Sequence, residues 1–282
     1  ERAKAFRQDV LDGKYTYCDL EMCETDGCLS EYTENPDDVS LEMPYPKVVN
    51  FTLDPSCNLK CIMCRDEVIC NRREDVERLD ALIDTKFIPM LKNAEILHPC
   101  SVGELFVSKH AKKLVKKAME TYPDLLVSIY TNGIFCNEKM FKELKLFGRV
   151  DELLISVHAT TKKTYDKIVR NGDFNRVMKN IKWAAEQERK RTIDSLTLNF
   201  VVSSLNYQEM PAFAQMAVDL GVRASFWEVR NWCSSELSND VSPYAIFDKN
   251  HPEHQKFLEV INNPIFKADK IVMNDILKNF IE

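Results

Sequence analysis

Three cysteines fall within eight residues in the segment CNLKCIMC, at Cys57, Cys61 and Cys64. Thiolates are common protein ligands of zinc ions and iron–sulfur clusters. Cysteines clustered in this way, in a chain without a signal peptide, favour metal binding over disulfides. A structural zinc site takes four ligands, so a zinc knuckle would need a further thiol such as Cys70. An iron–sulfur cluster held by three thiolates leaves one iron open for chemistry, and the spacing favours this interpretation.

A second group of thiols, Cys18, Cys23 and Cys28, lies in a polar segment near the start of the sequence. The spacing is even, and the segment holds no obvious fourth thiol. Cys233, far along the chain in RNWCSSE, could complete the set. We expect a metal at these residues rather than free thiols, either as an auxiliary iron–sulfur cluster or as a zinc ion.

The composition narrows the class of protein. With 282 residues, of which 45% are hydrophobic, the chain can bury the core of one large domain with an appendage. A formal net charge of −6 argues against a nucleic-acid binder, which usually carries a basic excess. No apolar stretch approaches the roughly 18 residues of a membrane span, and no signal peptide is present. We therefore expect a cytoplasmic protein without nucleic-acid or membrane partners and, since the sequence begins without Met, part of a longer chain.

The cysteine loop must be positioned by a fold, and the pattern beyond residue 46 is one of alternating strands and helices. Six short β-rich runs predict strands at residues 47–53, 94–97, 125–131, 152–158, 196–202 and 223–229. Helical patterns lie between them at residues 110–122, 138–147, 164–169, 176–188 and 208–220. This alternation implies right-handed β-α units and a mostly parallel sheet. Because polar residues gather at the strand ends, a barrel or partial barrel is favoured over an open doubly wound sheet.

Three regions follow from this pattern. Residues 1–46 form a cysteine-rich segment with a proline-containing linker, residues 47–230 form the α/β barrel, and residues 231–282 form a C-terminal extension. The cysteine loop comes directly after the first predicted strand. Since barrel enzymes carry their active sites at the carboxyl ends of the strands, the loop stands where chemistry is expected.

With these elements the chain resembles the radical S-adenosylmethionine (radical SAM) enzymes. CNLKCIMC is similar to their C-x3-C-x2-C motif, and the likeness extends over roughly residues 47–230. SVGELF at 101–106 looks like the family's G-E-P motif, with Leu105 in place of the proline and His98-Pro99-Cys100 in place of the usual upstream glycines. YTNGIF at 130–135 resembles the end of the third strand, and ISVHATTKKTYDKIVRNG at 155–172 resembles the fourth strand and its helix.

The resemblance implies a partial (β/α)6 TIM-like barrel of the radical SAM type, with a small cysteine-rich N-terminal extension. Cys57, Cys61 and Cys64 would bind a [4Fe-4S] cluster whose open iron chelates S-adenosyl-L-methionine (SAM). Reductive cleavage of SAM would give a 5′-deoxyadenosyl radical that takes hydrogen from the substrate, and a flavodoxin or ferredoxin would supply the electron. A glycine in the SAM loop would let the backbone approach the ligand closely. The positions expected to bind SAM are Gly103, Glu104, Asn132, Ser156, His158, Arg170 and Asn199.

The N-terminal cysteines resemble the SPASM extension of many peptide-modifying radical SAM enzymes, although that extension usually follows the barrel. The resemblance implies a peptide or protein side chain as substrate, modified by crosslinking, thioether formation or epimerisation. In an epimerase, Cys233 would be a candidate catalytic residue, as the hydrogen-atom donor to a substrate radical. A small molecule or sugar as substrate is the alternative within this chemistry. A zinc-stabilised, non-catalytic binding module is the alternative of another class.

Overall fold

The computed structural model describes residues 2–12, 14, 16, 46–70, 73–230 and 241–281. Contacts divide the chain into two units, Glu1–Pro46 and Lys47–Glu282. The first unit contains helix α1 (Arg2–Leu11). Thr16 lies past the end of this helix, and its backbone N–H and its hydroxyl both donate hydrogen bonds to the Asp9 carboxylate at 2.6 Å. These two bonds turn the chain back toward the helix that it has just left.

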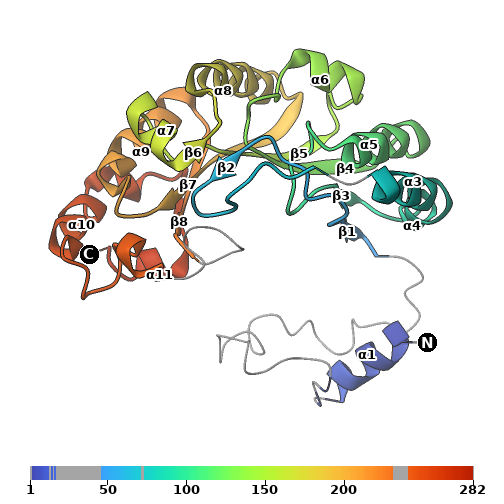
Figure 1. Ribbon diagram of the computed structural model, residues 1–282, viewed down its shortest axis with the longest axis horizontal. Coiled ribbons are helices and arrows are strands. Elements are labelled where there is room, and N and C mark those ends of the chain that lie inside the picture. The colour runs from blue at the N-terminus through green and yellow to red at the C-terminus, as the bar shows by residue number, and fades with distance from the viewer. Residues whose placement is uncertain are drawn as a thin grey trace. The chain divides into compact units, whose positions relative to one another are not determined.

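Within the described part of the second unit, seven parallel strands form one sheet (Figure 1). In sheet order they are β1 (Val48–Asn50), β3 (Ile96–His98), β4 (Leu126–Thr131), β5 (Val150–Ser156), β7 (Ile193–Val202), β8 (Arg223–Glu228) and β9 (Ile271–Met273). The first six confirm the predicted strands and the predicted α/β class. The last, β9, extends the sheet beyond β8 and comes from the region expected as a C-terminal extension.

Helices connect the strands. Between β1 and β3 the chain forms α3 (Arg73–Leu82), a π-helical turn (Ile83–Phe87) and α4 (Ile88–Met90), which the sequence pattern did not single out. The other α-helices are α5 (Lys109–Thr121), α6 (Glu138–Glu143), α7 (Lys162–Ile168), α8 (Phe174–Arg189), α9 (Met210–Leu220), α10 (His254–Ile261) and α11 (Asp275–Lys278). Side-chain caps at Ser108, Asn137, Thr161 and Asp173 fix where α5 to α8 begin. Of the helices described, none is long and apolar enough to cross a membrane.

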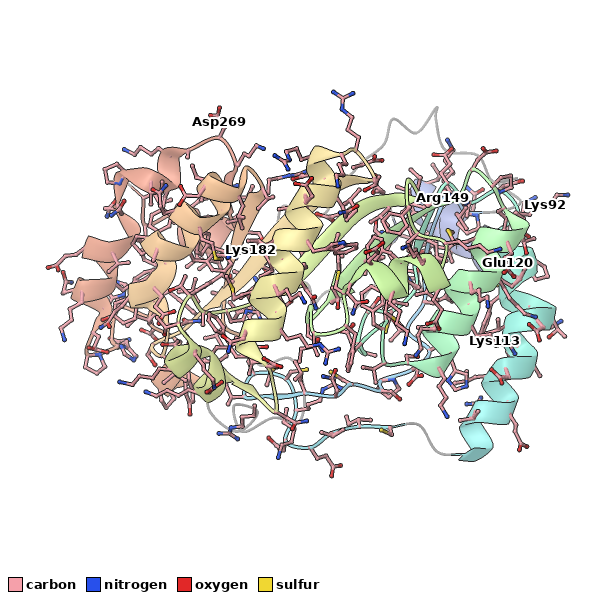
Figure 2. All side chains as sticks on the ribbon, turned by 90° about the horizontal axis from the view of Figure 1, so that it is seen from above. Lys92, Lys113, Glu120, Arg149, Lys182 and Asp269 are labelled. Atoms are coloured by element: carbon pink, nitrogen blue, oxygen red, sulfur yellow. The ribbon has the colours of Figure 1, made fainter. Side chains whose placement is uncertain are left out.

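The two faces of the sheet differ in polarity. Along β7, the even-numbered residues from 196 to 202 are fully buried, and Phe200 packs against Phe213 of α9 with ring centroids 4.9 Å apart. This is the face that the helices cover; Figure 2 looks onto their outer side, with Lys182 on α8. Toward the other face, called the inner face below, the register directs Tyr130 and Trp227, whose side chains are 44% and 45% exposed. The inner face is thus open to a ligand.

Candidate active site

The cysteine loop is clasped by a segment distant in the sequence. Strand β2 (Lys60–Cys61) pairs antiparallel with β6 (Val169–Arg170), so that Cys61 lies opposite Val169. The Asn171 side chain donates a hydrogen bond to the Asn58 carbonyl at 2.7 Å. These contacts tie the loop that follows β1 to the turn that follows α7. The cysteines are therefore held on a defined loop and not on a free one.

The three thiols of the motif lie around Arg65. The Arg65 Nε is 3.4 Å from the Cys64 Sγ, and the guanidinium also donates to two backbone carbonyls at 2.8 and 2.6 Å. Burial lowers the pKa of Arg65, but the hydrogen bond to Cys64 and the negative charges that Cys64, Cys57 and Cys61 can carry outweigh it and raise the pKa. All three thiols are thus within electrostatic reach of one cation.

The environment of the thiols fits a cluster better than a single ion. Burial raises the pKa of Cys57 and of Cys61, and neighbouring thiols add to the rise, so the protons leave readily only when a metal replaces them. No group of three His, Cys, Asp or Glu side chains among the described residues is placed to hold one metal ion. A [4Fe-4S] cluster offers each thiolate an iron atom of its own, so its ligands need not converge on one point.

A buried hydroxyl near this loop lacks a partner. Tyr165 of α7 is fully buried, and its hydroxyl oxygen forms no hydrogen bond within the described residues. Burial raises the pKa of Tyr165, and the charge that Cys61 can carry raises it further, so the phenol lies within reach of Cys61. Buried polar groups normally find partners. An O–H donor left over beside Cys61 is a second feature that fits a group bound at the loop.

Glu104 ties the loop after β3 to the end of β4. Its carboxylate is buried; one oxygen accepts from the Thr131 hydroxyl and the other from the Asn132 backbone N–H, both at 2.7 Å. Burial raises the pKa of Glu104, and these hydrogen bonds oppose the rise. The Glu104 N–H in turn donates to the Ser56 carbonyl at 2.9 Å. The Glu104 side chain thus positions the strand ends at which SAM is expected, and its contact with SAM stays a prediction.

Asn132 joins those strand ends to the cysteine loop. Its Nδ2 donates to the Asn58 Oδ1 at 3.0 Å and lies 3.8 Å from the Cys57 Sγ. Its Oδ1 accepts from the Ile134 N–H at 3.1 Å, which fixes the amide orientation. The predicted site residue Asn132 therefore lies directly beside the first cysteine of the motif.

Gly103 lies where two backbone segments meet. A Cβ at Gly103 would be 2.2 Å from the Asp54 carbonyl oxygen, 3.0 Å from the Ser56 carbonyl oxygen and 3.1 Å from the Cys100 Sγ. Real Cβ atoms do not approach backbone oxygens this closely, so no other residue type fits. We expected a glycine here to admit the ligand. The structure supplies a different reason, which is the approach of Gly103 to the chain that leads into the cysteine loop.

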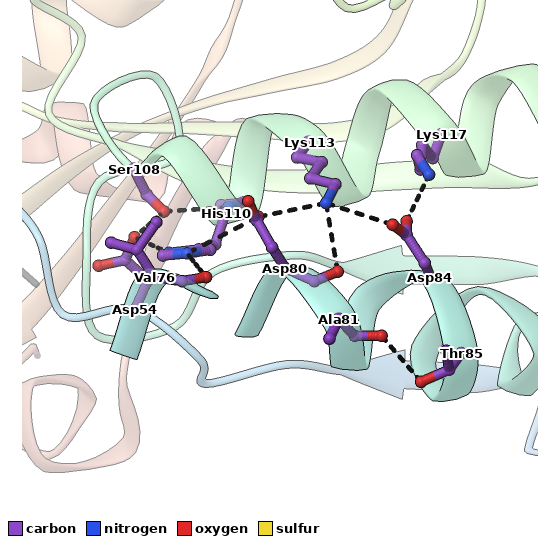
Figure 3. A network of polar contacts seen from close by, with 11 residues as sticks. Asp54, Val76, Asp80, Ala81, Asp84, Thr85, Ser108, His110, Lys113 and Lys117 are labelled. Atoms are coloured by element: carbon purple, nitrogen blue, oxygen red, sulfur yellow. Dashed lines mark hydrogen bonds and ion pairs between the residues drawn. The ribbon is translucent and has the colours of Figure 1, made fainter. Parts of the chain in front are cut away.

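Asp54 anchors the start of that loop in a buried network (Figure 3). Its Oδ1 accepts from the Ser56 N–H at 2.9 Å, and its Oδ2 accepts from the Ser108 hydroxyl and faces the His110 Nδ1 at 3.1 Å. The His110 Nε2 faces the Val76 carbonyl at 3.1 Å. Both ring nitrogens of His110 thus face oxygen atoms, and the ring ties Asp54 to α3. Burial raises the pKa of Asp54, but the hydrogen bonds outweigh it and lower the pKa.

Ser156 and Asn199 lie side by side on the inner face. The parallel register pairs Ser156 of β5 with Asn199 of β7, and Asn199 with Ser225 of β8. The Ser225 hydroxyl donates to the Asn199 Oδ1 at 3.0 Å. Ser225 was not predicted, although the alternation along β8, which puts Ser225 and Trp227 on one face, is the signal that could have found it. This polar row of hydroxyl and amide groups can bind the hydroxyls of a ribose.

His158 and Arg170 take part in contacts that hold the fold together. His158, just past β5, is buried, and its Nδ1 accepts from the Val201 N–H at 3.0 Å. Burial lowers the pKa of His158 to about 4, so the ring is neutral and links β5 to β7. Arg170 is exposed in β6, opposite Lys60 of the cysteine loop. His158 thus belongs to the sheet and Arg170 to the loop clasp, and contact of either with SAM stays a prediction.

Other cysteines divide into two kinds. Cys18, Cys23, Cys28 and Cys233 lie outside the described residues, so a metal or a catalytic role there stays a prediction. Among the described thiols, Cys70 is exposed, while Cys100 and Cys136 are buried outside the motif. Burial raises the pKa of Cys100 to about 12.

Three residues around the cysteine loop escaped the sequence analysis: Asp54, Arg65 and His110. Asp54 and Arg65 flank the motif directly, and a buried charge next to metal ligands could have been sought there. His110 is hidden in the basic run KHAKKLVKK, which reads as a solvated helix face. Only the helix phase, which turns His110 inward with Ala111 and Leu114, distinguishes it from the lysines around it.

Comparisons with known proteins agree with this geometry. The model of the radical SAM superfamily matches residues 53–217. A protein of Saccharolobus islandicus named probable GTP 3′,8-cyclase is 30% identical over 176 residues, which are 62% of this chain and 54% of that protein. The chain thus spans about half the length of the curated relatives it matches.

Among solved structures, Streptococcus suis SuiB bound to the precursor peptide SuiA has a TM-score of 0.52 at 14% identity, covering 96% of this chain and 62% of that one. The structure of anSMEcpe with bound AdoMet and peptide has a TM-score of 0.50 at 15% identity, covering 80% and 62%. At such identities the likeness shows the fold alone.

The matched residues run from just before Asp54 to helix α9, and so include the cysteine loop, Glu104, Asn132 and the residues Ser156 and Asn199 of the polar row. Members of this superfamily are enzymes that use a [4Fe-4S] cluster and SAM, and the thiols described above fit such a cluster. The chain belongs to the radical SAM superfamily.

Proposed function

We propose that the chain cleaves SAM reductively with a [4Fe-4S] cluster held by Cys57, Cys61 and Cys64, and abstracts hydrogen from a peptide or protein side chain. The bound cluster and SAM would supply the electron transfer and the 5′-deoxyadenosyl radical. The observation that carries the proposal is the placement of the three thiols, on a clasped loop that Asn132 joins to the carboxyl end of β4. A cytoplasmic location and a flavodoxin or ferredoxin as reductant are part of the proposal.

The residues of the chain would act by holding and orienting. Arg65 places a positive charge beside the thiolates, which favours their deprotonated, metal-bound form. Glu104 and Asn132 fix the strand ends next to the loop. Ser156 and Asn199 offer a hydroxyl and an amide to the SAM ribose, and the exposed ring of Trp227 offers an apolar surface for the substrate.

The peptide substrate rests on the SPASM-like spacing of the N-terminal cysteines. The solved enzymes that resemble the chain and carry peptides, SuiB and anSMEcpe, support the fold and are compatible with this substrate. The zinc-stabilised binding module loses its support, because the chain belongs to an enzyme superfamily.

A small molecule is the second candidate substrate, and a specific observation favours it. The relatives at 30% identity are named probable GTP 3′,8-cyclase, so a purine nucleotide deserves to be tested first among small molecules. The inner face presents both polar groups and exposed aromatic rings, which would suit a nucleotide as well as a peptide side chain.

Anaerobic reconstitution tests the proposal. We expect about four irons per chain at the motif, and formation of 5′-deoxyadenosine from SAM when dithionite is added. Replacement of Cys57, Cys61 or Cys64 by Ala should abolish both, because each thiolate is a ligand. Retained cleavage in all three variants would end the assignment.

Cys70→Ala is the matched control. Cys70 is the thiol that a zinc knuckle would recruit, and it is exposed and close to the motif in sequence. The proposal expects this variant to keep its iron and its SAM cleavage. Stimulation of 5′-deoxyadenosine formation by a panel of peptides or by GTP then separates the two substrate classes.

A further inference from the structure

A hollow of about 490 Å³ lies beside the cysteine loop, among helices α5, α6 and α8. Its apolar part is formed by Phe106, Phe135 and Met140, and three cations, Lys112, Lys139 and Arg176, stand around them. None of the side chains of the polar row on the inner face takes part in it. The hollow is therefore separate from the place where SAM and substrate are expected.

The charged side chains around this hollow are all positive, and no acidic side chain pairs with them within the described residues. Its lining contains no acidic residue. Lys112, Lys139 and Arg176 form no ion pair within the part of the chain that the structure describes, whereas Lys113 and Lys117 on the same helix as Lys112 both do. The Arg176 guanidinium is held 4.7 Å above the centre of the Phe135 ring, which leaves its N–H groups for a partner. Such a set attracts an anionic partner.

The hollow reaches the cysteine motif through one residue. Asn58, which follows Cys57, is part of the lining. Its Oδ1 accepts from the Asn132 Nδ2 at 3.0 Å, and that same nitrogen lies 3.8 Å from the Cys57 Sγ. A partner seated in the hollow would thus touch the residue that follows Cys57 in the motif.

We propose that this hollow is the docking site of an acidic one-electron carrier protein of the flavodoxin or ferredoxin class. The inference rests on the proposed function, since it names the partner of the same cluster. The carrier is oxidised by one electron, which enters the cluster, and no bond is made or broken. Lys139 and Arg176 are exposed, which suits a transient, salt-sensitive protein encounter more than the tight enclosure of a small anion.

Binding of a flavodoxin to the anaerobically reconstituted full chain tests the proposal. Kd is measured at low and at high ionic strength for the unaltered chain, Lys139→Glu and Arg176→Glu. At low salt each charge reversal should weaken binding roughly tenfold and reduce the salt dependence. Lys92→Glu is the control: Lys92 (Figure 2) is an exposed lysine in the turn before β3, outside the hollow, and its replacement should leave Kd unchanged.

Three results would overturn the docking site. One is an unchanged Kd in both hollow variants, and another is an equal loss of affinity in Lys92→Glu. The third is that calorimetry shows the unaltered chain binding pyrophosphate, and that both hollow variants lose this binding while keeping their affinity for flavodoxin. That result would make the hollow a small-anion site. Cleavage of SAM by the unaltered chain with dithionite tests the proposed function separately, because dithionite needs no docking surface.

Discussion

Replacing His110 by Leu should destabilise the chain strongly, because it leaves the buried Asp54 carboxylate without one of its partners. The Asp54 carboxylate is 2% exposed and the His110 side chain 1% exposed, with Nδ1 and Oδ2 3.1 Å apart. Removing one partner of a buried, hydrogen-bonded pair costs about 3–5 kcal/mol. The remaining bonds, from the Ser56 N–H and the Ser108 hydroxyl, keep Asp54 partly satisfied, so we expect the lower end, about 3 kcal/mol.

Urea unfolding followed by circular dichroism measures this loss. The control is Lys113→Leu in the same network (Figure 3): Lys113 is partly exposed and pairs with Asp80 and Asp84 at 3.3 Å each, and exposed ion pairs contribute little. Its unfolding midpoint should therefore stay almost unchanged. A loss below about 1 kcal/mol for His110→Leu would refute the reasoning, since removing a partner from a buried carboxylate should cost more than that. If the His110→Leu variant also binds less iron after reconstitution, the contact between Asp54 and His110 helps to hold the cysteine loop in place.

Three further outcomes follow from single atoms of the structure. Gly103→Ala should lower the free energy of unfolding in urea by about 1–3 kcal/mol, because the added Cβ would clash with the Asp54 carbonyl oxygen. The loss should exceed that of the control Gly148→Ala, where a Cβ meets nothing within 4 Å and only the positive φ is strained. Tyr165→Phe should leave stability unchanged or raise it by about 1 kcal/mol in the metal-free chain, since the hydroxyl is buried without a partner; a marked loss would mean that a partner exists. The pKa of Asp54 is lower in the folded chain than in the unfolded chain. The ionised carboxylate therefore contributes fully to the free energy of unfolding above the unfolded pKa of about 3.9, and this contribution is lost as the pH falls from there through the folded pKa. Asp54→Asn should therefore flatten the acid limb of the stability curve, and an acid limb identical to that of the unaltered chain would contradict the assignment.

Local patterns were enough to predict the sheet and the motif. Strands β4, β5, β7 and β8 are long runs of apolar and β-branched residues between helical patterns, and the three cysteines sit close together in sequence. Both signals are contained in a few consecutive residues, so no knowledge of the rest of the fold is needed to see them.

Long-range contacts account for what the sequence did not predict. The pairing of β2 with β6 joins two-residue strands, and β9 has three residues, which are too few to show a period. The contact between Asp54 and His110 depends on how α5 lies against the exit of β1, and the need for a glycine at position 103 depends on its approach to the Asp54 carbonyl oxygen. Such features arise only when distant segments meet, so each appears in the sequence as an unremarkable residue.

The clasp on the cysteine loop sets an order of events in biosynthesis. The Asn58 carbonyl and the Asn171 side chain that donates to it are 113 positions apart, so the ribosome releases the cysteines long before the segment that holds them. Until β6 has been made, Cys61 has no strand opposite it. The nascent chain therefore passes through a long interval in which the three thiols lack the clasp that holds their loop in the folded chain. A chain truncated before residue 169 would carry all three thiols of the motif without the clasp that arranges them.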